Sequence, residues 1–376
     1  MTSVSALYLS SNRRAPLCGV VSLALAAAIV PQTLVAQQAN LALEEIIVTA
    51  RKRAESVQDV PIAVTAITSE LSQPSIRRLE DIQGITPNVI IRNINTVPGG
   101  SAISIRGVSY QEIDKSFDPA IGVMLDGVYL GVSSGQLLNN FDIARIEVLR
   151  GPQGTLFGRN TIGGVVNVIR TDPTLDWGID ASVALGSEGR EDYKAVVNAP
   201  IIEDKLGIKL FASSINSDGW IYNTTRREDV GGDDYLTYGF ALLGQPTEDL
   251  SIKFHYEKNE DKTDVGAWSN FNQPEDLVCQ LSFLPFLPWT PAQGCEALDE
   301  GSDEDHNSMN TNNPNDTEYD TSILTVDWDL GGAVLTSITA YREQEEDTLS
   351  EYDASSAPFL YLDFLQEYEQ FSQELR

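Results

Sequence analysis

Few residues in this chain have the types and spacing that catalysis or metal binding requires. The only two histidines, His255 and His306, are not spaced from Cys279 and Cys295 as the ligands of a zinc site are. The acidic run 299–305 lacks the ligand spacing of an EF-hand calcium loop. No nucleophile, base and orienting group stand out as a catalytic set. We therefore expect no enzyme activity, no cofactor and no metal site.

The cysteines predict a different kind of chemistry. Cys18 falls in an N-terminal leader, which leaves Cys279 and Cys295 as an even pair within one loop-like segment. In an exported protein such a pair predicts a disulfide, and two free thiols are the alternative.

A glycine-rich segment, 151–164, connects two expected strands. Residues 145–150 alternate charged and apolar side chains, and residues 163–169 are rich in valine. The glycines permit positive φ angles and close backbone packing, which predicts a crossover buried inside a larger structure. A phosphate-binding loop is excluded because no Gly-Lys-Ser/Thr follows the glycines. A glycine-rich hairpin of an ordinary β-rich domain is the alternative.

Residues 149–168, LRGPQGTLFGRNTIGGVVNV, resemble the motif that closes the plug domain of TonB-dependent outer-membrane receptors. The preceding chain follows the order of that plug, with Val60-Pro61-Ile62, Thr86-Pro87, Ile105-Arg106-Gly107 and 122–131 (GVMLDGVYLG). The resemblance implies a mixed α/β plug domain over residues 60–172, followed by an antiparallel transmembrane β-barrel over residues 173–376.

Hydrophobic periodicity predicts the elements of this plug. Strands are expected at 62–67, 102–108 and 121–130, the last broken by the hairpin-type turn Asp126-Gly127. A short helix is expected at 75–82, and one or two helical turns at 134–140. By resemblance, the ligand contacts would come from plug apices at 95–100 and 111–117.

The first 36 residues have the three parts of a secretory signal peptide. Arg13-Arg14 precede an apolar run at 17–30, and small residues near Ala36 suit cleavage within a few residues of that position.

The β-branched run Glu44 to Ala50 lies in the segment 37–59, between this leader and the plug-like domain. It comprises Glu44, Glu45, Ile46, Ile47, Val48, Thr49 and Ala50. A strand this near a free end can add to the edge of a partner's sheet, where main-chain hydrogen bonds supply affinity. The run resembles the TonB box of the family, which implies that a TonB-type energy-coupling protein in the periplasm binds it. An ordinary strand of a folded domain is the alternative.

Arg106 and Arg150 are each expected on a strand beside a glycine. In the family, arginines at the matching positions face carboxylates of the barrel wall, so the resemblance implies plug–barrel contacts. A planar, bidentate guanidinium suits a strong pair in a confined space. Pairing with a carboxylate of the same domain is the alternative.

Charge divides the chain near residue 172. The 376 residues carry a formal charge of −30, and residues 40–172 contain 14 acidic and 12 basic side chains, whereas residues 173–376 contain 41 and 11. This acidic balance argues against nucleic-acid binding, which needs clustered Lys and Arg. After the leader no apolar run is long enough for a membrane-spanning helix.

The second part alternates apolar and polar residues, as at 179–185 and 250–257. Such strands are typical of a barrel wall with lipid outside and water inside, although a soluble sandwich also alternates. Short connections (201–204, 246–248, 331–332) alternate with long ones (217–234, 263–318, about 350–365). This asymmetry favours an outer-membrane barrel, whose periplasmic turns are short.

About eight strands are expected, the last beginning near Gln366. Since plugged outer-membrane transporters use about 22 strands, we expect an N-terminal fragment whose barrel is incomplete. The resemblance implies active transport of a scarce nutrient, such as a ferric siderophore or cobalamin, across the bacterial outer membrane. Its partners would be the coupling protein, outer-membrane lipid and an extracellular small-molecule ligand. A passive porin-like channel, which needs neither plug nor coupling segment, and a secreted soluble β-rich protein are the alternatives.

Overall fold

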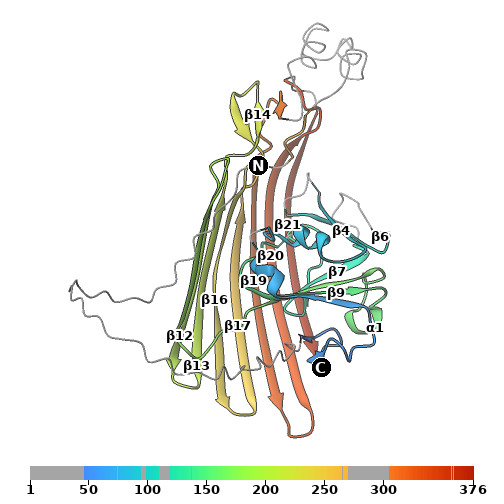
Figure 1. The fold of residues 1–376 in the computed structure, drawn as a ribbon, viewed down its shortest axis with the longest axis vertical. Helices are drawn as coiled ribbons and strands as arrows, with labels where there is room; N and C mark the ends of the chain where they lie inside the picture. The colour runs from blue at the N-terminus through green and yellow to red at the C-terminus, as the bar shows by residue number, and fades with distance from the viewer. Residues whose placement is uncertain are drawn as a thin grey trace, which may run out of the picture.

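The computed structural model describes residues 46–73, 75–94, 99–109, 118–136, 138–264, 266–269, 305–356, 358 and 360–376. The leader, Glu44, Glu45, Cys279, Cys295 and most of the expected ligand-contacting apices lie outside these residues. The predicted signal peptide and disulfide therefore stay predictions. The described chain has two parts, which we call the small domain (46–172) and the large sheet (178–375), and they lie side by side (Figure 1).

The small domain is built on a five-stranded mixed sheet. Its order is β3 (Val64–Ile67), β9 (Ile143–Arg150), β10 (Gly164–Arg170), β7 (Ile121–Leu125) and β8 (Val128–Tyr129). Only the β10–β7 pair is parallel. A second sheet joins β4 (Val89–Asn93), β5 (Ser101–Ile105) and β6 (Val108–Ser109). Apolar side chains from both sheets form one buried core, including Ile67, Ile91, Ile105, Val123, Val148 and Val166.

The glycine-rich segment 151–164 is mostly exposed, so the prediction of a buried crossover is wrong for most of it and holds at its end, where Gly163 and Gly164 are buried. A Cβ on Gly163 would lie 2.3 Å from Ile121 Cδ1, and one on Gly164 would lie 2.4 Å from the Leu149 carbonyl oxygen. These two glycines therefore let β10 approach its neighbours more closely than any side chain allows. The turn Asp126-Gly127 is also confirmed, with φ angles of 51° and 85° at its two central residues.

Three expected elements of the small domain differ from the structure. The helix expected at 75–82 is a 3-10 helix, η2 (Leu79–Gly84), and the described residues of 134–140 form no helix. The strand expected at 102–108 ends at Ile105, so Arg106 lies in a tight turn with a φ of 54° rather than on a strand. The adjacent Gly107, with a φ of 80°, permits this turn.

The remaining described helices are also short. They are η1 (Ser69–Ser72) and α1 (Gly154–Phe157). Within the described ranges, no helix has the length and apolar character needed to cross a membrane.

The large sheet consists of eight antiparallel strands, the number that the sequence predicts. In sheet order they are β11 (Gly178–Leu185), β12 (Glu191–Ile202), β13 (Leu206–Asn216), β16 (Asp234–Thr247), β17 (Leu250–Asp261), β19 (Asn315–Asp329), β20 (Val334–Glu351) and β21 (Tyr361–Leu375). The last strand begins at Tyr361, five residues before the expected Gln366. Within the described residues β11 and β21 form the two edges and do not pair with each other.

Short and long connections alternate along this sheet. Tight turns follow β12, β16 and β19 at one end. Two longer connections at the other end carry β14 (Ile221–Asn223), β15 (Glu228–Val230) and β18 (His306–Asn307), which pair into a small sheet. Figure 1 shows the tight turns at the lower end and β14 at the upper end.

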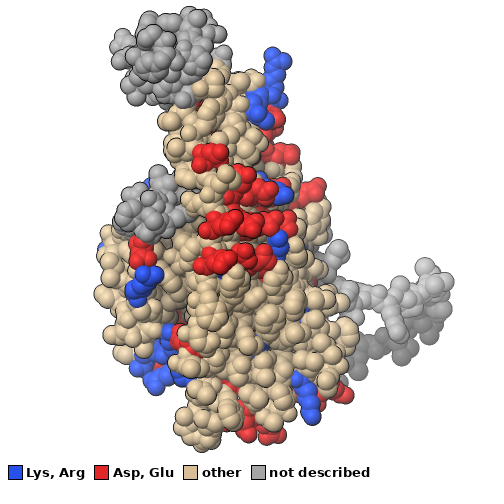
Figure 2. Space-filling model, turned by 180° about the vertical axis from the view of Figure 1, so that it is seen from behind, with Lys and Arg blue, Asp and Glu red and all other residues tan. Residues whose placement is uncertain are grey.

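The two faces of the large sheet differ in polarity. On β13, Lys209 and Phe211 are buried against Asp142 and Phe141 of the small domain and Ser213 is also buried, whereas Leu210 is 51% exposed. Exposed apolar side chains recur on the outward face, at Ile179, Val183, Leu185, Leu324, Leu365, Phe371 and Leu375. Near the upper end the outward side chains become acidic, because the register aligns Glu260, Glu318, Glu345 and Glu367 in one row. Figure 2 shows such acidic rows above a broad area with few charges.

We predict that Gly164→Ala destabilises the small domain by about 1–3 kcal/mol, because the new Cβ meets the Leu149 carbonyl. The check is the denaturant concentration at which the small domain becomes sensitive to protease. Gly154→Ala is the matched control, because a Cβ there meets nothing within 4 Å. Equal protease sensitivity of the two variants would contradict the packing argument.

Candidate functional site

The run 44–50, which resembles a TonB box, is called the coupling segment below. Its described residues include the first strand of a hairpin that is docked on the small domain. Strand β1 (Ile47–Val48) pairs with β2 (Glu55–Ser56), and Val57 N donates to the Ile46 carbonyl at 2.9 Å. Val48 and Ala50 are fully buried. They pack in a second apolar cluster with Val60, Met124, Leu149 and Val165. In contrast, Ile46 and Ile47 are 36% and 41% exposed, so residues 46–50 are partly buried and partly open to solvent.

Charged residues close this hairpin. Arg51 pairs with Glu55 at 2.5 Å, and Arg53 also contacts Glu55. The hydrogen bond from Arg51 lowers the pKa of the Glu55 carboxyl below its ordinary value. Lys52 reaches the large sheet and pairs with Glu374 of β21 at 2.6 Å. The hairpin is thus tied to both parts of the structure.

Thr49 binds the buried carboxylate of Glu147 on β9. Its backbone N–H donates to Glu147 Oε1 at 2.7 Å, and its hydroxyl lies 3.1 Å from the same oxygen. Arg145 Nε donates to Oε1 at 2.8 Å, and Asn167 Nδ2 donates to Oε2 at 3.3 Å. Glu147 is fully buried, so these donors replace the water that an exposed carboxylate would bind.

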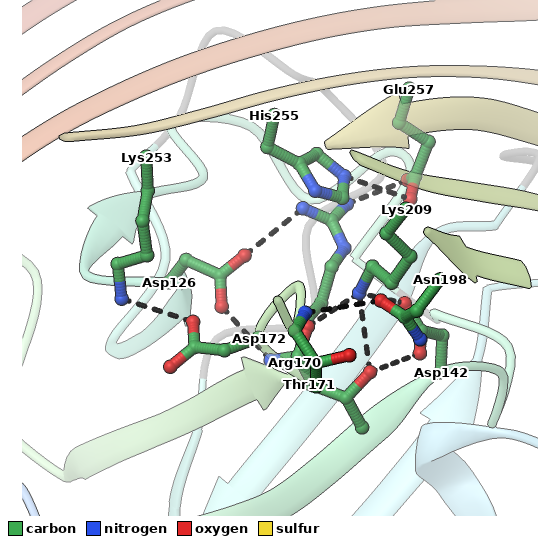
Figure 3. A network of polar contacts seen from close by, with 11 residues as sticks. Asp126, Asp142, Arg170, Thr171, Asp172, Asn198, Lys209, Lys253, His255 and Glu257 are labelled. Carbon is green, nitrogen blue, oxygen red and sulfur yellow. Dashed lines mark hydrogen bonds and ion pairs between the residues drawn. The ribbon is translucent and has the colours of Figure 1, made fainter. Parts of the chain in front are cut away.

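The other end of the small domain is fixed to the large sheet by buried charges (Figure 3). Arg170, the last residue of β10, pairs with Asp126 at 3.1 Å and with Glu257 of β17 at 2.7 Å. Both the Arg170 and the Glu257 side chains are more than nine-tenths buried. A buried ion of this kind requires its partner, because desolvation of a lone charge costs several kcal/mol.

A second pair lies beside the first. Lys209 of β13 is fully buried and binds Asp142 at 2.5 Å, and its ammonium also donates to the Thr171 carbonyl. Lys253 of β17 pairs with Asp172 at 3.0 Å, but this pair is largely exposed. The sheet therefore supplies charges of both signs to the point where the chain leaves the small domain.

Side chains of β19 to β21 contact Tyr129 and the loop 131–136 of the small domain. Gln344 donates to the Ser134 hydroxyl at 2.8 Å, and Gln370 donates to the Tyr129 carbonyl at 2.7 Å. A Cβ on Gly131 would lie 2.3 Å from the Tyr368 hydroxyl, and one on Gly135 would lie 2.4 Å from the Tyr319 ring. Glycine at these two positions lets the loop lie directly against the strands.

Arg106 and Arg150, the predicted plug–barrel contacts, form no ion pair with a carboxylate among the described residues. Arg106 is exposed in its turn, and Arg150 Nη1 donates weakly to the Pro87 carbonyl at 3.5 Å. Their predicted role stays a prediction.

The sequence did not predict the ion pairs that join the large sheet to the small domain, although it contained one indication of them. Alternation along β17 places Lys253, His255 and Glu257 together on the polar side, and that side faces the small domain. The fold determines which residue of the small domain each of these side chains contacts, and no pattern in the neighbouring sequence indicates that partner.

Comparisons with known proteins agree with this arrangement. Residues 56–165 match the model of a family described as TonB-dependent Receptor Plug Domain. The pesticin receptor of Yersinia pestis is 30% identical over 217 residues, which cover 56% of this chain and 31% of that protein. An iron-regulated outer membrane virulence protein of Vibrio cholerae is 27% identical over 60% of this chain and 33% of its own length.

A solved structure extends the likeness over both parts of the chain. The ferric yersiniabactin uptake receptor from Yersinia pestis aligns with a TM-score of 0.67 and 20% identity, covering 84% of this chain and 45% of that one. The agreement at this identity concerns the fold. The chain spans about a third of the length of the curated relatives that it matches.

We predict that Arg170→Met, which keeps most of the side-chain volume, lowers the free energy of unfolding by about 3–5 kcal/mol, because it leaves the buried Glu257 without its cation. The measurement is a guanidinium titration of the folded protein in detergent.

Lys253→Met is the control, since it breaks an exposed pair that is worth about 0–1 kcal/mol. If both variants unfolded at the same denaturant concentration, the Arg170 pair would not be what fixes the small domain.

Proposed function

We propose that this chain is part of a TonB-dependent outer-membrane receptor, with the plug domain of that family followed by strands of its β-barrel, and that it serves energy-dependent uptake of a ferric siderophore. Its location is the bacterial outer membrane. The small domain is the plug and the large sheet is the barrel wall. We assign residues 60–172 to the plug, 173–376 to the wall and 44–50 to the TonB box.

The observation that carries this proposal is the position of the coupling hairpin. It lies towards the end of the sheet that has the tight turns (Figure 1), and outer-membrane barrels place their short turns in the periplasm. A periplasmic partner can therefore reach Ile46 and Ile47, which are exposed, without entering the barrel. If this segment added to a sheet edge of the partner, its main-chain hydrogen bonds would link the partner to the plug, so that the partner could pull on it.

The names of several relatives support the proposed substrate class. One is named a pesticin receptor, one is iron-regulated, and the aligned structure is a receptor for ferric yersiniabactin uptake. A ferric siderophore is a cargo too large and too scarce for passive diffusion, so its uptake requires a ligand site and a plug that moves. Energy for that movement comes from the partner, because the outer membrane has neither a nucleotide supply nor a proton gradient of its own.

The plug–wall contacts suit a domain that must stay seated until it is pulled. Hydrogen bonds and ion pairs such as Lys52 with Glu374 and Gln344 with Ser134 can exchange for water when the plug shifts. A passive channel gives no reason for the seated domain or for its docked hairpin. A secreted soluble protein gives no reason for the exposed apolar face of the wall.

We predict that Ile47→Pro abolishes uptake of ⁵⁵Fe supplied as a ferric siderophore to cells that depend on the intact receptor. Proline removes the backbone N–H of Ile47 and prevents regular strand pairing, while surface binding of the ferric siderophore is unchanged.

Ile47→Ala is the matched control, because it keeps the backbone N–H and shortens only an exposed side chain; it should retain most of the uptake. Full uptake by Ile47→Pro would refute the coupling role of this segment. Equal loss by both variants would attribute the effect to the side chain instead.

A further inference from the structure

We propose that Glu147 is the positioning residue that holds the coupling segment on the plug, because its carboxylate occupies the backbone N–H of Thr49 that a partner strand needs. This inference deepens the proposed function and rests on it. In this proposal the buried Glu147 carboxylate sets the fraction of time during which the coupling segment is undocked and can bind the energy-coupling protein.

The geometry of β1 shows which edge of this strand could pair with a partner strand. The Ile46 carbonyl points towards β2, since it accepts from Val57 N. The backbone N–H and C=O groups of successive residues in a strand point to opposite edges. Those of Ile46 and Val48 therefore point towards β2, whereas the N–H groups of Ile47 and Thr49 point to the other edge. That other edge is the one left for a partner strand, and Glu147 binds it through the Thr49 N–H at 2.7 Å.

The site is built to hold a carboxylate and a threonine. Four donors hydrogen-bond to the Glu147 oxygens: Thr49 N, the Thr49 hydroxyl, Arg145 Nε and Asn167 Nδ2. The Thr49 hydroxyl also lies 3.4 Å from both Arg145 Nη2 and Asn167 Nδ2. A charged acceptor among four donors makes hydrogen bonds about twice as strong as neutral ones.

The apolar contacts alone would not set this position. Val48 and Ala50 enter the second cluster on either side of Thr49, but apolar contact has little directional preference. Glu147 adds direction, because its two oxygens accept from both the backbone and the side chain of one residue. The same bond makes docking and partner pairing mutually exclusive at the Thr49 N–H, since one N–H cannot serve both acceptors fully.

The test measures backbone amide hydrogen exchange of residues 48–50 in the intact receptor, in lipid nanodiscs and without added siderophore. Glu147→Gln places an amide NH₂ among donors and removes the charge, so exchange should become at least tenfold faster. Glu70→Gln is the matched control: Glu70 lies in the same domain, and its carboxylate accepts hydrogen bonds from Thr68 N and the Ser69 hydroxyl. Its exchange at 48–50 should equal that of the wild type.

A second variant guards against a folding defect in Glu147→Gln. Thr49→Val has nearly the same shape and keeps the backbone N–H, but it loses the hydroxyl contacts, so exchange should rise about three- to fivefold. Unchanged exchange in both Glu147→Gln and Thr49→Val would overturn the assignment of Glu147.

A binding arm separates this inference from the proposed function. The purified periplasmic domain of a TonB-type protein should bind Glu147→Gln at least fivefold more tightly than wild type. If exchange became faster but this binding did not change, the role of Glu147 in docking would stand and the segment would not be the partner's binding site. Faster exchange together with tighter binding supports both.

Discussion

A charge buried between two parts of a protein must have its partner, and this requirement connects the plug to the wall. Glu257 and Lys209 point inward from the wall and are almost without solvent contact, so each depends on an opposite charge from the plug. Arg170 and Asp142 supply those charges. Because a strand alternates its side chains, the residues between these inward charges point outward and can be apolar throughout. The same two-residue period thus places polar side chains towards the plug and, below the acidic rows, apolar side chains on the outward face.

The two ends of the plug are held in different ways. At its last strand, Arg170 to Asp172 combine one buried pair, one exposed pair and the covalent connection into the wall. At its first strand, the hairpin 46–57 is held by a small apolar cluster, by Lys52 with Glu374 and by Thr49 with Glu147. A docked terminal hairpin has fewer contacts to break than the central sheet, so it belongs to the part of the domain that opens at lowest cost. Force applied at residues 44–50 would therefore act first on the part that releases most easily.

Sequence patterns predicted correctly those elements that are determined by residues close together in the sequence. The Asp126-Gly127 turn, the eight alternating strands and the close approach at Gly163 and Gly164 all follow from residues adjacent in sequence. The functional contacts do not: Arg170 and Glu257 are 87 residues apart, and Thr49 and Glu147 are 98 apart. Nothing in the sequence near Glu147 indicates that its carboxylate accepts hydrogen bonds from Thr49. Arg106 shows the opposite error, because an apolar run predicted a strand where Gly107 permits a turn.

The most direct test of this account is a nitroxide scan of β13 from Ile208 to Ser213 in the intact receptor in a lipid bilayer. Collision with oxygen, which concentrates in lipid, should be high at Ile208, Leu210 and Ala212 and low at Lys209, Phe211 and Ser213, where the plug covers the strand. A water-soluble nickel complex should reach none of the first three. Accessibility without a two-residue period, or nickel access at Leu210, would contradict a wall that faces lipid on one side and its plug on the other.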